Sequence, residues 1–513
     1  MSTLKSTERQ PAGRVLSKKQ AVLLAVALLA LCAGAAIDIH AVAIGLIAGA
    51  MAFWTLFVGF RIVLWLAASA HRYPNIPAAD VADPSLPSYT VLVPLYKEGR
   101  MLPRLIEAMQ RLQYPPDKLE VLLLVEEDDE ETWAVLRALT LPAHFDIKIV
   151  QVPAGGPRTK PNALNFGLFW AKGDRCVIYD AEDRPEPDQL LKAVAVFRRS
   201  PPDVACLQAR LAFWNGTSSW ITRFYWADYI IHFEWTLAGL ARLKLVPPLG
   251  GTSNHFVTEA LKQVAIRSES LPFKEGYVGG WDPFNVTEDA ELAGALARLG
   301  YRVGMLDSTT WEEAAAHLRV ADKQRRRWLK GFAQTGFMYT RHPVKASREM
   351  GVAKWFFYNL LMLGTPFTLV LNPFFWGATI VYFATRATVI VELFPLPLYY
   401  LGLTLMLAGN LALFYQLMAA CMKREGFGFV KYMFLAPAWW LFITWSAYVM
   451  LFELIVRPHH WHKTVHGHDL AREEVEVVLT RTLVTSPPAG VGPAASQAAL
   501  QAASPATRHR SSP

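Results

Sequence analysis

The hydrophobic residues of this 513-residue chain fall into two kinds of segment, long runs near both ends and short runs between them. Residues 20–37 carry no charge, and 41–70 carry only Arg61. As an α-helix, each run is long enough to cross a hydrocarbon layer of about 30 Å. Further apolar runs occupy 354–384, 397–421 and 430–456. The pattern predicts a membrane protein with a polar region between two groups of helices.

Between residues 72 and 350, short apolar runs alternate with segments of helical periodicity. The runs expected to be strands are 89–95, 119–125, 146–151, 175–179 and 203–211. The segments expected to be helices are 99–113, 130–139, 161–171 and 188–199. Continuous apolar strands alternating with helices indicate a mostly parallel sheet covered on both faces. We therefore expect an α/β domain inserted between membrane helices.

Polar clusters follow four of the expected strands. They are "YKEG" (96–99), "EEDDEET" (126–132), "GGPRTKPNALN" (155–165) and "DAED" (180–183). Because sheets of this kind bind ligands at the carboxyl ends of their strands, we expect the four clusters to line one crevice.

The acids after the fourth strand have the chemistry of a metal site. Asp180 and Glu182 are spaced so that both can face one ligand in an extended turn, and Asp183 is an alternative to Glu182. Hard oxygen ligands suit Mg²⁺ or Mn²⁺ that completes its shell with substrate phosphate. An acidic turn in contact with solvent is the competing interpretation.

The third cluster offers an anion site. Arg158, Lys160, Asn162 and Asn165 lie at the opening of a helix, and Pro161 suits its first turn. Helix N-termini favour phosphate, so these residues complement the neighbouring acids.

Two later segments also carry candidate residues. "NVTEDAELAGALARLGY" (285–301) predicts a helix that begins at Thr287, with Glu288 and Asp289 in its first turn. Taken alone, this pattern favours a plain N-cap with acids that complement the helix dipole. "DKQRRRWLKGFAQTGF" (322–337) has the form of a basic amphipathic helix on a membrane surface.

Taken in order, these motifs resemble a known family. The strand-end acids, K-x-x-A-L-N, D-x-D/E, T-E-D and Q-x-x-R-W are similar to those of the processive, membrane-embedded family 2 glycosyltransferases, which include cellulose, curdlan, chitin and hyaluronan synthases. The resemblance covers about 89–330. It implies a GT-A (Rossmann-like) domain and a UDP-sugar-dependent hexosyltransferase that polymerises a β-linked polysaccharide, most simply a β-glucan from UDP-glucose, with Mg²⁺ or Mn²⁺.

The resemblance also implies roles for residues around the donor. Glu126 and Glu127 match the paired acids that hold the nucleobase, with a one-residue shift to Asp128 left open. The remaining donor positions are nucleotide-sugar contacts at Lys160, Asn165, Asp180 and Arg327, and metal ligands at Asp180 with Glu182 or Asp183. Glu stands where Asp is usual in both acid motifs, which leaves the second metal ligand undecided.

For the acceptor, Asp289 matches the T-E-D aspartate, the general base. Acceptor contacts are implied at Gly251, Thr252, Glu288, Gln324 and Trp328. A base opposite a metal-bound leaving diphosphate gives direct displacement with inversion. The indole of Trp328 offers a face for a sugar ring.

The basic residues of segment 1–19 predict a cytoplasmic N-terminus. Two transmembrane helices in 20–71 then return the chain to the same side, so the domain of 72–350 lies on the cytoplasmic side of a bacterial-type inner membrane. We expect interfacial helices at 217–245 and 329–342, from their aromatic and basic residues, and a bend or break at Asn372–Pro373.

The C-terminal part is expected to contain transmembrane or interfacial helices in 351–456 and a disordered tail in 485–513. Segment 457–484 resembles a gating loop at Trp461, Lys463 and Thr464, against simple interfacial anchoring. A gating loop must be cytoplasmic, whereas three full crossings after residue 350 would put it outside. Either one apolar segment is interfacial or 354–394 crosses twice.

The expected partners are a UDP-sugar, a growing polysaccharide, the lipid bilayer and periplasmic export proteins. Nucleic acid is excluded because the soluble region shows no basic face with aromatic residues. One alternative is a non-processive enzyme that adds a single sugar to a lipid or short glycan. A transporter or nucleotide-sensing receptor is disfavoured, because ion-coupled transport uses ionisable groups deep in the spans.

Overall fold

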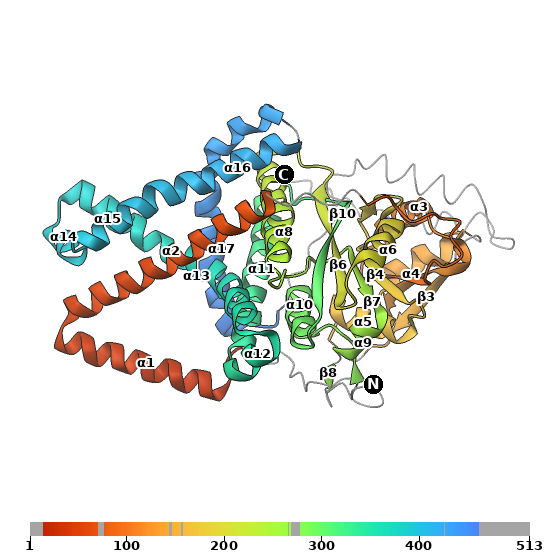
Figure 1. Ribbon diagram of the computed structural model, residues 1–513, viewed down its shortest axis with the longest axis horizontal. Coiled ribbons are helices and arrows are strands. Elements are labelled where there is room, and N and C mark those ends of the chain that lie inside the picture. The colour runs from red at the N-terminus through yellow and green to blue at the C-terminus, as the bar shows by residue number, and fades with distance from the viewer. Residues whose placement is uncertain are drawn as a thin grey trace, which may run out of the picture.

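The computed structural model describes residues 14–69, 76–142, 146–154, 157–264, 266–267, 277–424 and 426–460. An α/β domain lies on one side, and long helices project from it on the other (Figure 1).

A mixed sheet forms the centre of the α/β domain, in the order β3-β2-β1-β4-β7-β6-β10-β5. Its strands are β1 (Tyr89–Leu95), β2 (Leu119–Glu126), β3 (Asp146–Val152), β4 (Arg175–Ile178), β5 (Arg184–Pro185), β6 (Val204–Phe213), β7 (Asn254–Val257) and β10 (Arg302–Glu312). The pairs β3-β2-β1-β4 and β6-β10 are parallel, whereas β7 is antiparallel to both β4 and β6. A separate ladder joins β8 (Ile266–Arg267) and β9 (Tyr277–Val278).

All five expected strands are present, within two residues at each end. Sequence patterning missed β7 because four residues are too few to show a period. It missed β10 because that strand contains glycine and several polar residues.

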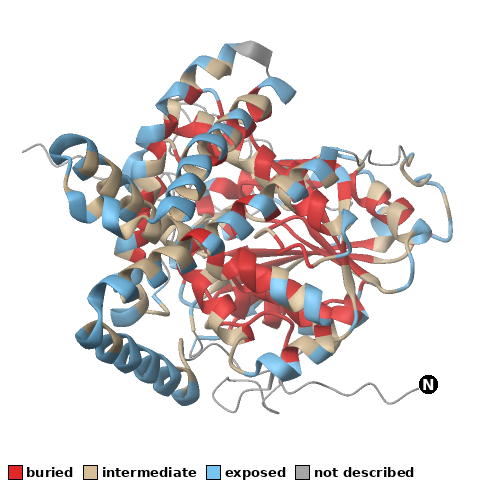
Figure 2. Cartoon of the chain, turned by 60° about the vertical axis from the view of Figure 1, so that its left-hand side comes forward, coloured by how far each residue is buried: buried red, intermediate tan, exposed pale blue. Residues whose placement is uncertain are grey.

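Helices cover both faces of the sheet. They are α3 (Leu102–Gln110), α4 (Glu130–Ala138), α5 (Lys160–Trp170), α6 (Gln189–Arg199), α9 (Thr258–Gln263) and α10 (Glu288–Arg298), with 3-10 turns at η1 (Gly99–Met101) and η2 (Pro116–Lys118). Alternate residues of β1 join different cores: Val91 packs with Leu105 of α3, and Leu92 packs in the cluster of Leu164 of α5. The buried residues of the strands form the red centre of Figure 2.

The remaining helices build the projecting part and its junction with the sheet. At the junction lie α7 (Trp220–Tyr229), the π-helix η3 (Ile230–Leu237), α8 (Ala238–Arg242), α11 (Leu318–Tyr339) and α12 (Pro343–Met350). The projecting part contains α1 (Lys18–Ile37), α2 (Ile39–Ser69), α13 (Val352–Thr385), α14 (Thr388–Leu393), α15 (Leu396–Thr404), η4 (Leu405–Gly409), α16 (Asn410–Arg424), η5 (Gly426–Leu435) and α17 (Ala436–Val456).

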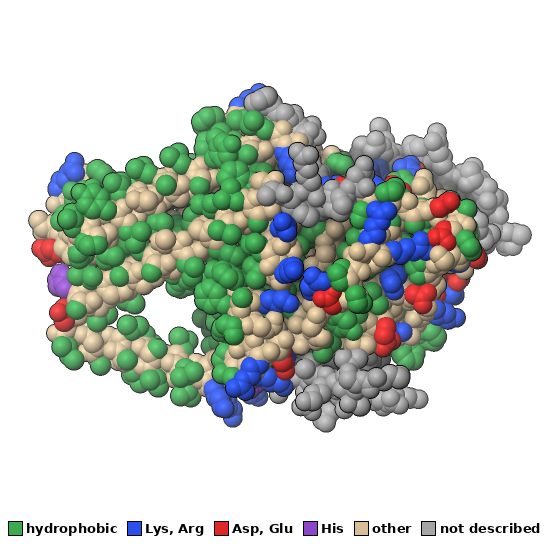
Figure 3. Space-filling view, in the orientation of Figure 1, with side chains coloured by type: hydrophobic (Ala, Val, Ile, Leu, Met, Phe, Trp, Pro, Cys, Tyr) green, Lys and Arg blue, Asp and Glu red, His purple; other side chains and the backbone are tan. Residues whose placement is uncertain are grey.

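Five helical stretches in the described part of the chain are long and apolar enough to cross a membrane. They are Lys18–Ile37, Ile39–Ser69, Val352–Thr385, Leu396–Lys423 and Gly428–Val456. Hydrophobic side chains cover the projecting part in Figure 3, whereas charged side chains gather over the α/β domain and its junction. This distribution indicates association with a membrane.

Helix α13 is not broken at Asn372–Pro373, although both Pro366 and Pro373 lie inside it. It packs against α2, α11 and α17, contacts that hold the helix on both sides of the prolines. Because α13 continues to Thr385 without turning back, the alternative in which 354–394 crosses twice is wrong.

The last apolar stretch runs beside α11. The Ser446 hydroxyl donates to Asp322 at 2.8 Å, and one turn from the end of α17 Glu453 pairs with Lys330 at 3.2 Å. Beyond the helix, the carbonyl oxygens of Pro458 and His460 accept hydrogen bonds from α11 side chains. Residue 460 therefore lies beside α11.

Candidate active site

A cavity of about 750 Å³ opens where the carboxyl ends of β1, β2 and β4 meet the junction helices. It continues between α2, α13 and α16. The expected site residues that line it are Glu126, Lys160, Asp180, Glu182, Gly251, Thr252, Glu288, Asp289, Gln324, Arg327 and Trp328. Tertiary structure thus brings residues separated by about two hundred positions in the chain into one crevice.

Lys160 joins two of the strand-end loops to the loop before β7. Its ammonium group forms an ion pair with Asp180 and donates to the carbonyl oxygen of Gly251 at 2.7 Å. Burial opposes the charge of Lys160, but Asp180 and Glu288 outweigh this effect and raise its pKa. The lysine therefore stays protonated and presents a cation at the start of α5, as an anion site requires.

The turn after β4 separates its acids by environment. Glu182 lines the cavity, and burial together with Asp180 raises its pKa to about 8. Asp183 is buried and accepts hydrogen bonds from the Thr252 hydroxyl and, at 2.7 Å, from the Asp180 N–H. Burial raises the pKa of Asp183 well above its usual range. Asp183 therefore ties the turn to the loop before β7, and Asp180 with Glu182 faces the cavity.

The cavity-facing acids fit a divalent metal. No group of three or more His, Cys, Asp or Glu side chains in the described residues is arranged to hold a metal ion. Mg²⁺ and Mn²⁺ are commonly held by one or two carboxylates together with substrate phosphates. Asp180 and Glu182 supply that donor set, with Lys160 beside them for the phosphates.

Asp289 lies in the first turn of α10. One carboxylate oxygen accepts from the Ala290 N–H at 2.7 Å, and the other lies 3.5 Å from where a side chain on Gly251 would begin. Burial raises the pKa of Asp289, which favours its ability to take up a proton.

Thr287 is the N-cap residue of α10, with Glu288 and Asp289 in the first turn, but its side chain makes no capping hydrogen bond. The side chain packs instead against Gly331 of α11, where any Cβ would overlap it. This close approach fixes the T-E-D segment against the Q-x-x-R-W helix.

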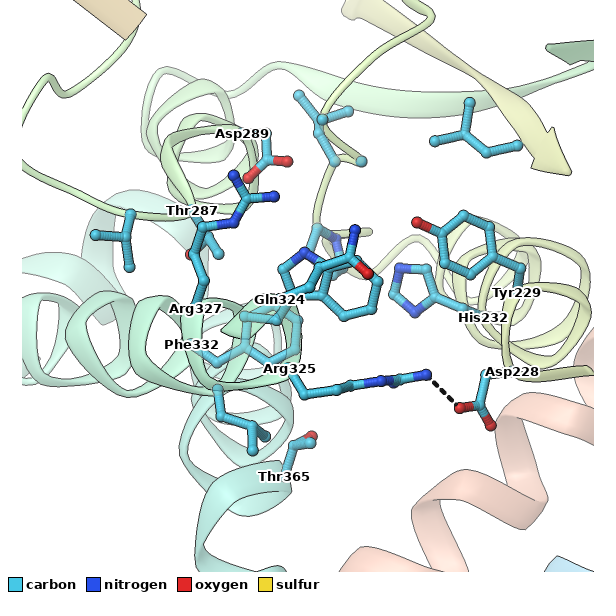
Figure 4. A pocket seen from close by; sticks show the side chains of 18 of the residues that line it. Asp228, Tyr229, His232, Thr287, Asp289, Gln324, Arg325, Arg327, Phe332 and Thr365 are labelled. Atoms are coloured by element: carbon cyan, nitrogen blue, oxygen red, sulfur yellow. Dashed lines mark hydrogen bonds and ion pairs between the residues drawn. The ribbon is translucent and has the colours of Figure 1, made fainter. Parts of the chain in front are cut away.

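Helix α11 supplies the opposite wall. Gln324, Arg327 and Trp328 all line the cavity, and Arg327 points toward Asp289 (Figure 4). The Trp328 ring packs near Tyr225 and Tyr229, with centroids 6.0 and 6.1 Å away. The indole is thereby held in one place at the cavity wall.

Among the paired acids, only the first lines the cavity. Burial, and to a smaller extent Asp128, raises the pKa of Glu126 to about 7. Glu127 is exposed and accepts from the Ala154 N–H at 2.8 Å, while Asp128 pairs with Arg158 at 2.5 Å. The geometry therefore favours Glu126 over Glu127 at the donor.

The position of Asn165 does not fit the expected contact with the nucleotide sugar. It is buried beneath the site and exchanges two hydrogen bonds with the backbone of Trp281, so its side chain is not available to a nucleotide sugar. The gating candidates Trp461, Lys463 and Thr464 lie outside the described residues.

Sequence reasoning missed several residues of the cavity wall. Asp228, Tyr229, His232 and Arg325 line the side of it that lies away from Asp289 in Figure 4. Glu312, at the end of β10, also lines it, and burial and Glu182 raise its pKa to about 8. Asp228 and Tyr229 end α7, His232 lies in η3 and Glu312 ends β10, outside every motif, whereas Arg325 occupies an unspecified position of Q-x-x-R-W on α11. Only the fold brings these elements to the site.

Several ionisable side chains with shifted pKa values around one cavity are typical of an active site. Residues 87–331 match the protein family described as "Glycosyltransferase like family 2".

Several curated proteins are similar to the chain. It is 24% identical over 405 residues to the probable glycosyltransferase YdaM of Bacillus subtilis, covering 76% of this chain and 89% of that protein. It is 24% identical to the beta-monoglucosyldiacylglycerol synthase of Synechocystis sp., covering 57% and 61% of the two chains. It is 26% identical to the probable glucomannan 4-beta-mannosyltransferase 7 of Oryza sativa, covering 58% and 50%.

A solved mannosyltransferase from Pyrobaculum calidifontis, in complex with GDP-Man and Mn²⁺, is 18% identical. It superposes with a TM-score of 0.49 over 80% of this chain and 99% of that one.

The middle of the chain is a glycosyltransferase family 2 domain, and the protein is a glycosyltransferase that acts on a sugar donor.

Proposed function

We propose that the protein is a processive, inverting glycosyltransferase that polymerises a β-linked glycan, most simply a β-glucan from UDP-glucose, and passes it into the membrane. The observation that carries the proposal is the continuity of one cavity, from Asp180 past Asp289 and Trp328 to the helices α2, α13 and α16. A product that grows at the base can extend along this cavity, away from the donor.

In the proposed reaction, Asp289 takes the proton of an acceptor hydroxyl, whose oxygen attacks the anomeric carbon of the donor sugar. The bond from that carbon to the diphosphate breaks on the opposite side, so the configuration inverts. Lys160 and Arg327 lie where they can offset charge on the departing diphosphate. Trp328 and Gln324 orient the acceptor sugar.

Asp180 and Glu182 are the residues that would hold Mg²⁺ or Mn²⁺. Such an ion supplies Lewis-acid stabilisation of negative charge on the leaving diphosphate.

The topology that fits this function places the N-terminus, the α/β domain and residue 460 in the cytoplasm. In that arrangement α1, α2, α13 and the α15–α16 stretch cross an inner membrane, and α17 lies along its surface beside α11. The hydrogen bonds from Lys330 and Gln334 to the segment after α17 support it. Export across a periplasm would require further proteins.

A second candidate function is the transfer of one sugar to a lipid. We call the part of the cavity between α2, α13 and α16 its membrane half. Apolar side chains there favour transfer to a lipid, among them Phe57, Leu361 and Leu413.

Product analysis tests both functions. Purified full-length protein in nanodiscs is given Mn²⁺ and, separately, UDP-glucose, UDP-GlcNAc and GDP-mannose, and the product is sized and its linkages determined. A glycan of many β-linked residues supports the first proposal. A product of one added sugar, extractable into organic solvent, supports the second and overturns the first. No transfer from any donor contradicts both.

A further inference from the structure

The membrane half of the cavity contains charged groups that the proposed reaction does not use. Arg61 of α2, Asp228 and His232 of α7 and η3, and Arg325 of α11 all line it. Arg325 pairs with Asp228 at 2.7 Å, on the side of the cavity away from Asp289 (Figure 4).

Arg61 is the only Asp, Glu, Lys or Arg in the 31 residues of α2. The helix is held close to the junction at Gly239, where any Cβ would overlap the Leu64 carbonyl oxygen. This contact lies within a turn of Arg61 and places the arginine beside η3. A charge in so apolar a helix is costly and usually serves a function.

Arg61 is half-buried and makes no hydrogen bond or ion pair with any described residue. Asp228 is the nearby carboxylate, but its Oδ2 atom already accepts from Arg325 and, at 3.2 Å, from the Trp439 indole N–H. A partly buried cation without a direct partner is expected to be satisfied by a ligand or by water.

The net charge of this cluster is positive. Burial, with Arg61 and Arg325 nearby, lowers the pKa of His232 to about 4, so its imidazole is neutral at pH 7. Two arginines against the single carboxylate of Asp228 leave one positive charge. Such a site complements one anionic group, and arginine is well suited to phosphate.

The walls around Arg61 indicate what carries the anion. Trp54 and Phe57 of α2, Leu361 of α13 and Leu413 of α16 line this part of the cavity. These side chains suit a hydrocarbon chain. Thr365, Asn372 and Gln416 on the same helices offer hydrogen-bond partners to polar groups attached to it.

We propose that this half of the cavity binds an anionic lipid, with its phosphate on Arg61, its hydrocarbon chain between α2, α13 and α16, and a head-group hydroxyl directed to Asp289. The lipid is then the acceptor, or the primer from which a glycan grows. This inference rests on the proposed function, because it uses Asp289 as the base. The head-group oxygen bonds to the anomeric carbon, its proton passes to Asp289, and the nucleoside diphosphate leaves.

The test compares lipids in nanodiscs of phosphatidylcholine that contain either phosphatidylglycerol, an anionic lipid with free hydroxyls, or uncharged diacylglycerol. Full-length protein receives radiolabelled UDP-glucose, and label is counted in the organic extract and in polymer. Soluble glycerol phosphate is the free-anion probe. Arg61→Gln removes the charge and Arg61→Lys keeps it. Arg386→Gln, at the αL end of α13 outside the cavity, is the matched control.

Phosphatidylglycerol is expected to be labelled or to prime polymer, and diacylglycerol to be much less effective. Arg61→Gln should raise the half-saturating phosphatidylglycerol fraction about tenfold or more, as loss of a charge-assisted hydrogen bond predicts. Arg61→Lys should recover part of it, and Arg386→Gln should match the wild type.

Equal use of diacylglycerol and phosphatidylglycerol by the wild type would overturn the inference without needing any variant. So would stimulation by glycerol phosphate or by a soluble acidic glycan in uncharged discs. If Asp289→Asn abolishes transfer while Arg61→Gln leaves the lipid preference unchanged, the proposed function stands and the lipid site does not.

Discussion

Replacing Asp289 with asparagine removes the proposed base with little change in shape. The Ala290 N–H that now donates to the carboxylate at 2.7 Å can donate equally to the amide oxygen. A Cβ placed on Gly251 would lie 3.5 Å from the other carboxylate oxygen, an ordinary contact distance, so an amide of the same shape fits without crowding the glycine. The variant should therefore fold normally and bind nucleotide as the wild type does.

Its rate should fall by about 10²–10⁴, the contribution of a positioned general base. This corresponds to about 2.7–5.5 kcal/mol of transition-state stabilisation. Because the Asp289 carboxylate takes up the acceptor proton in the transition state and does not bind the donor, kcat should fall and the donor KM should change little.

The assay is release of nucleoside diphosphate under saturating donor, with nucleotide affinity measured separately by calorimetry. Glu288→Gln is a comparison one residue earlier, where acceptor binding, not proton transfer, is the proposed role. Retention of more than about a tenth of the wild-type kcat by Asp289→Asn would refute the assignment.

Three further predictions concern the surroundings of the site. Glu182→Gln should raise the Mn²⁺ concentration needed for half-maximal rate, whereas Asp183→Ala should mainly lower the melting temperature; the reverse pattern would contradict the division of roles. The loss in Asp183→Ala should be about 1–3 kcal/mol, because the Asp180 N–H loses its acceptor while the Thr252 hydroxyl keeps the carbonyl oxygen of Ile178. Gly331→Ala should destabilise by about 1–3 kcal/mol through overpacking, and Gly377→Ala, with open space around it, should not; equal melting temperatures would contradict the packing argument. The pKa of Glu126 is about 7 in the folded protein, above its ordinary value, so its contribution to stability is present at low pH and is lost as pH rises through 7. Glu126→Gln should thus melt higher than the wild type at pH 8 and like it at pH 5; no difference at pH 8 would show that the carboxylate is solvated.

The alternation of short apolar runs was enough to predict five strands of the sheet and the helices between them, because buried parallel strands need continuous apolar side chains. The motifs were enough to predict eleven of the residues that line the cavity, all in the half next to Asp180 and Asp289. Asn165 failed because a motif position does not reveal whether a side chain faces the ligand or the core. Here Trp281, more than a hundred residues away, takes its hydrogen bonds.

Length and composition by themselves determined that five helical stretches among the described residues are able to cross a membrane. Composition could not decide how each stretch is oriented relative to a membrane, because α17 has the same length and apolarity whether it crosses the membrane or packs along its surface. Only the tertiary structure places Ser446 on Asp322 and Glu453 on Lys330.

The sequence likewise determined which acids follow β4 but not which of them face the substrate. That choice depends on Thr252, which lies just before β7, the antiparallel strand beside β4. Its hydroxyl donates a hydrogen bond to Asp183 and so holds that carboxylate away from the cavity. In the same way Arg61 is one charge in an apolar run until folding sets it beside Asp228 and His232 in the cavity. Local pattern specifies elements and the chemistry they carry, whereas contacts between distant segments decide which side chains meet.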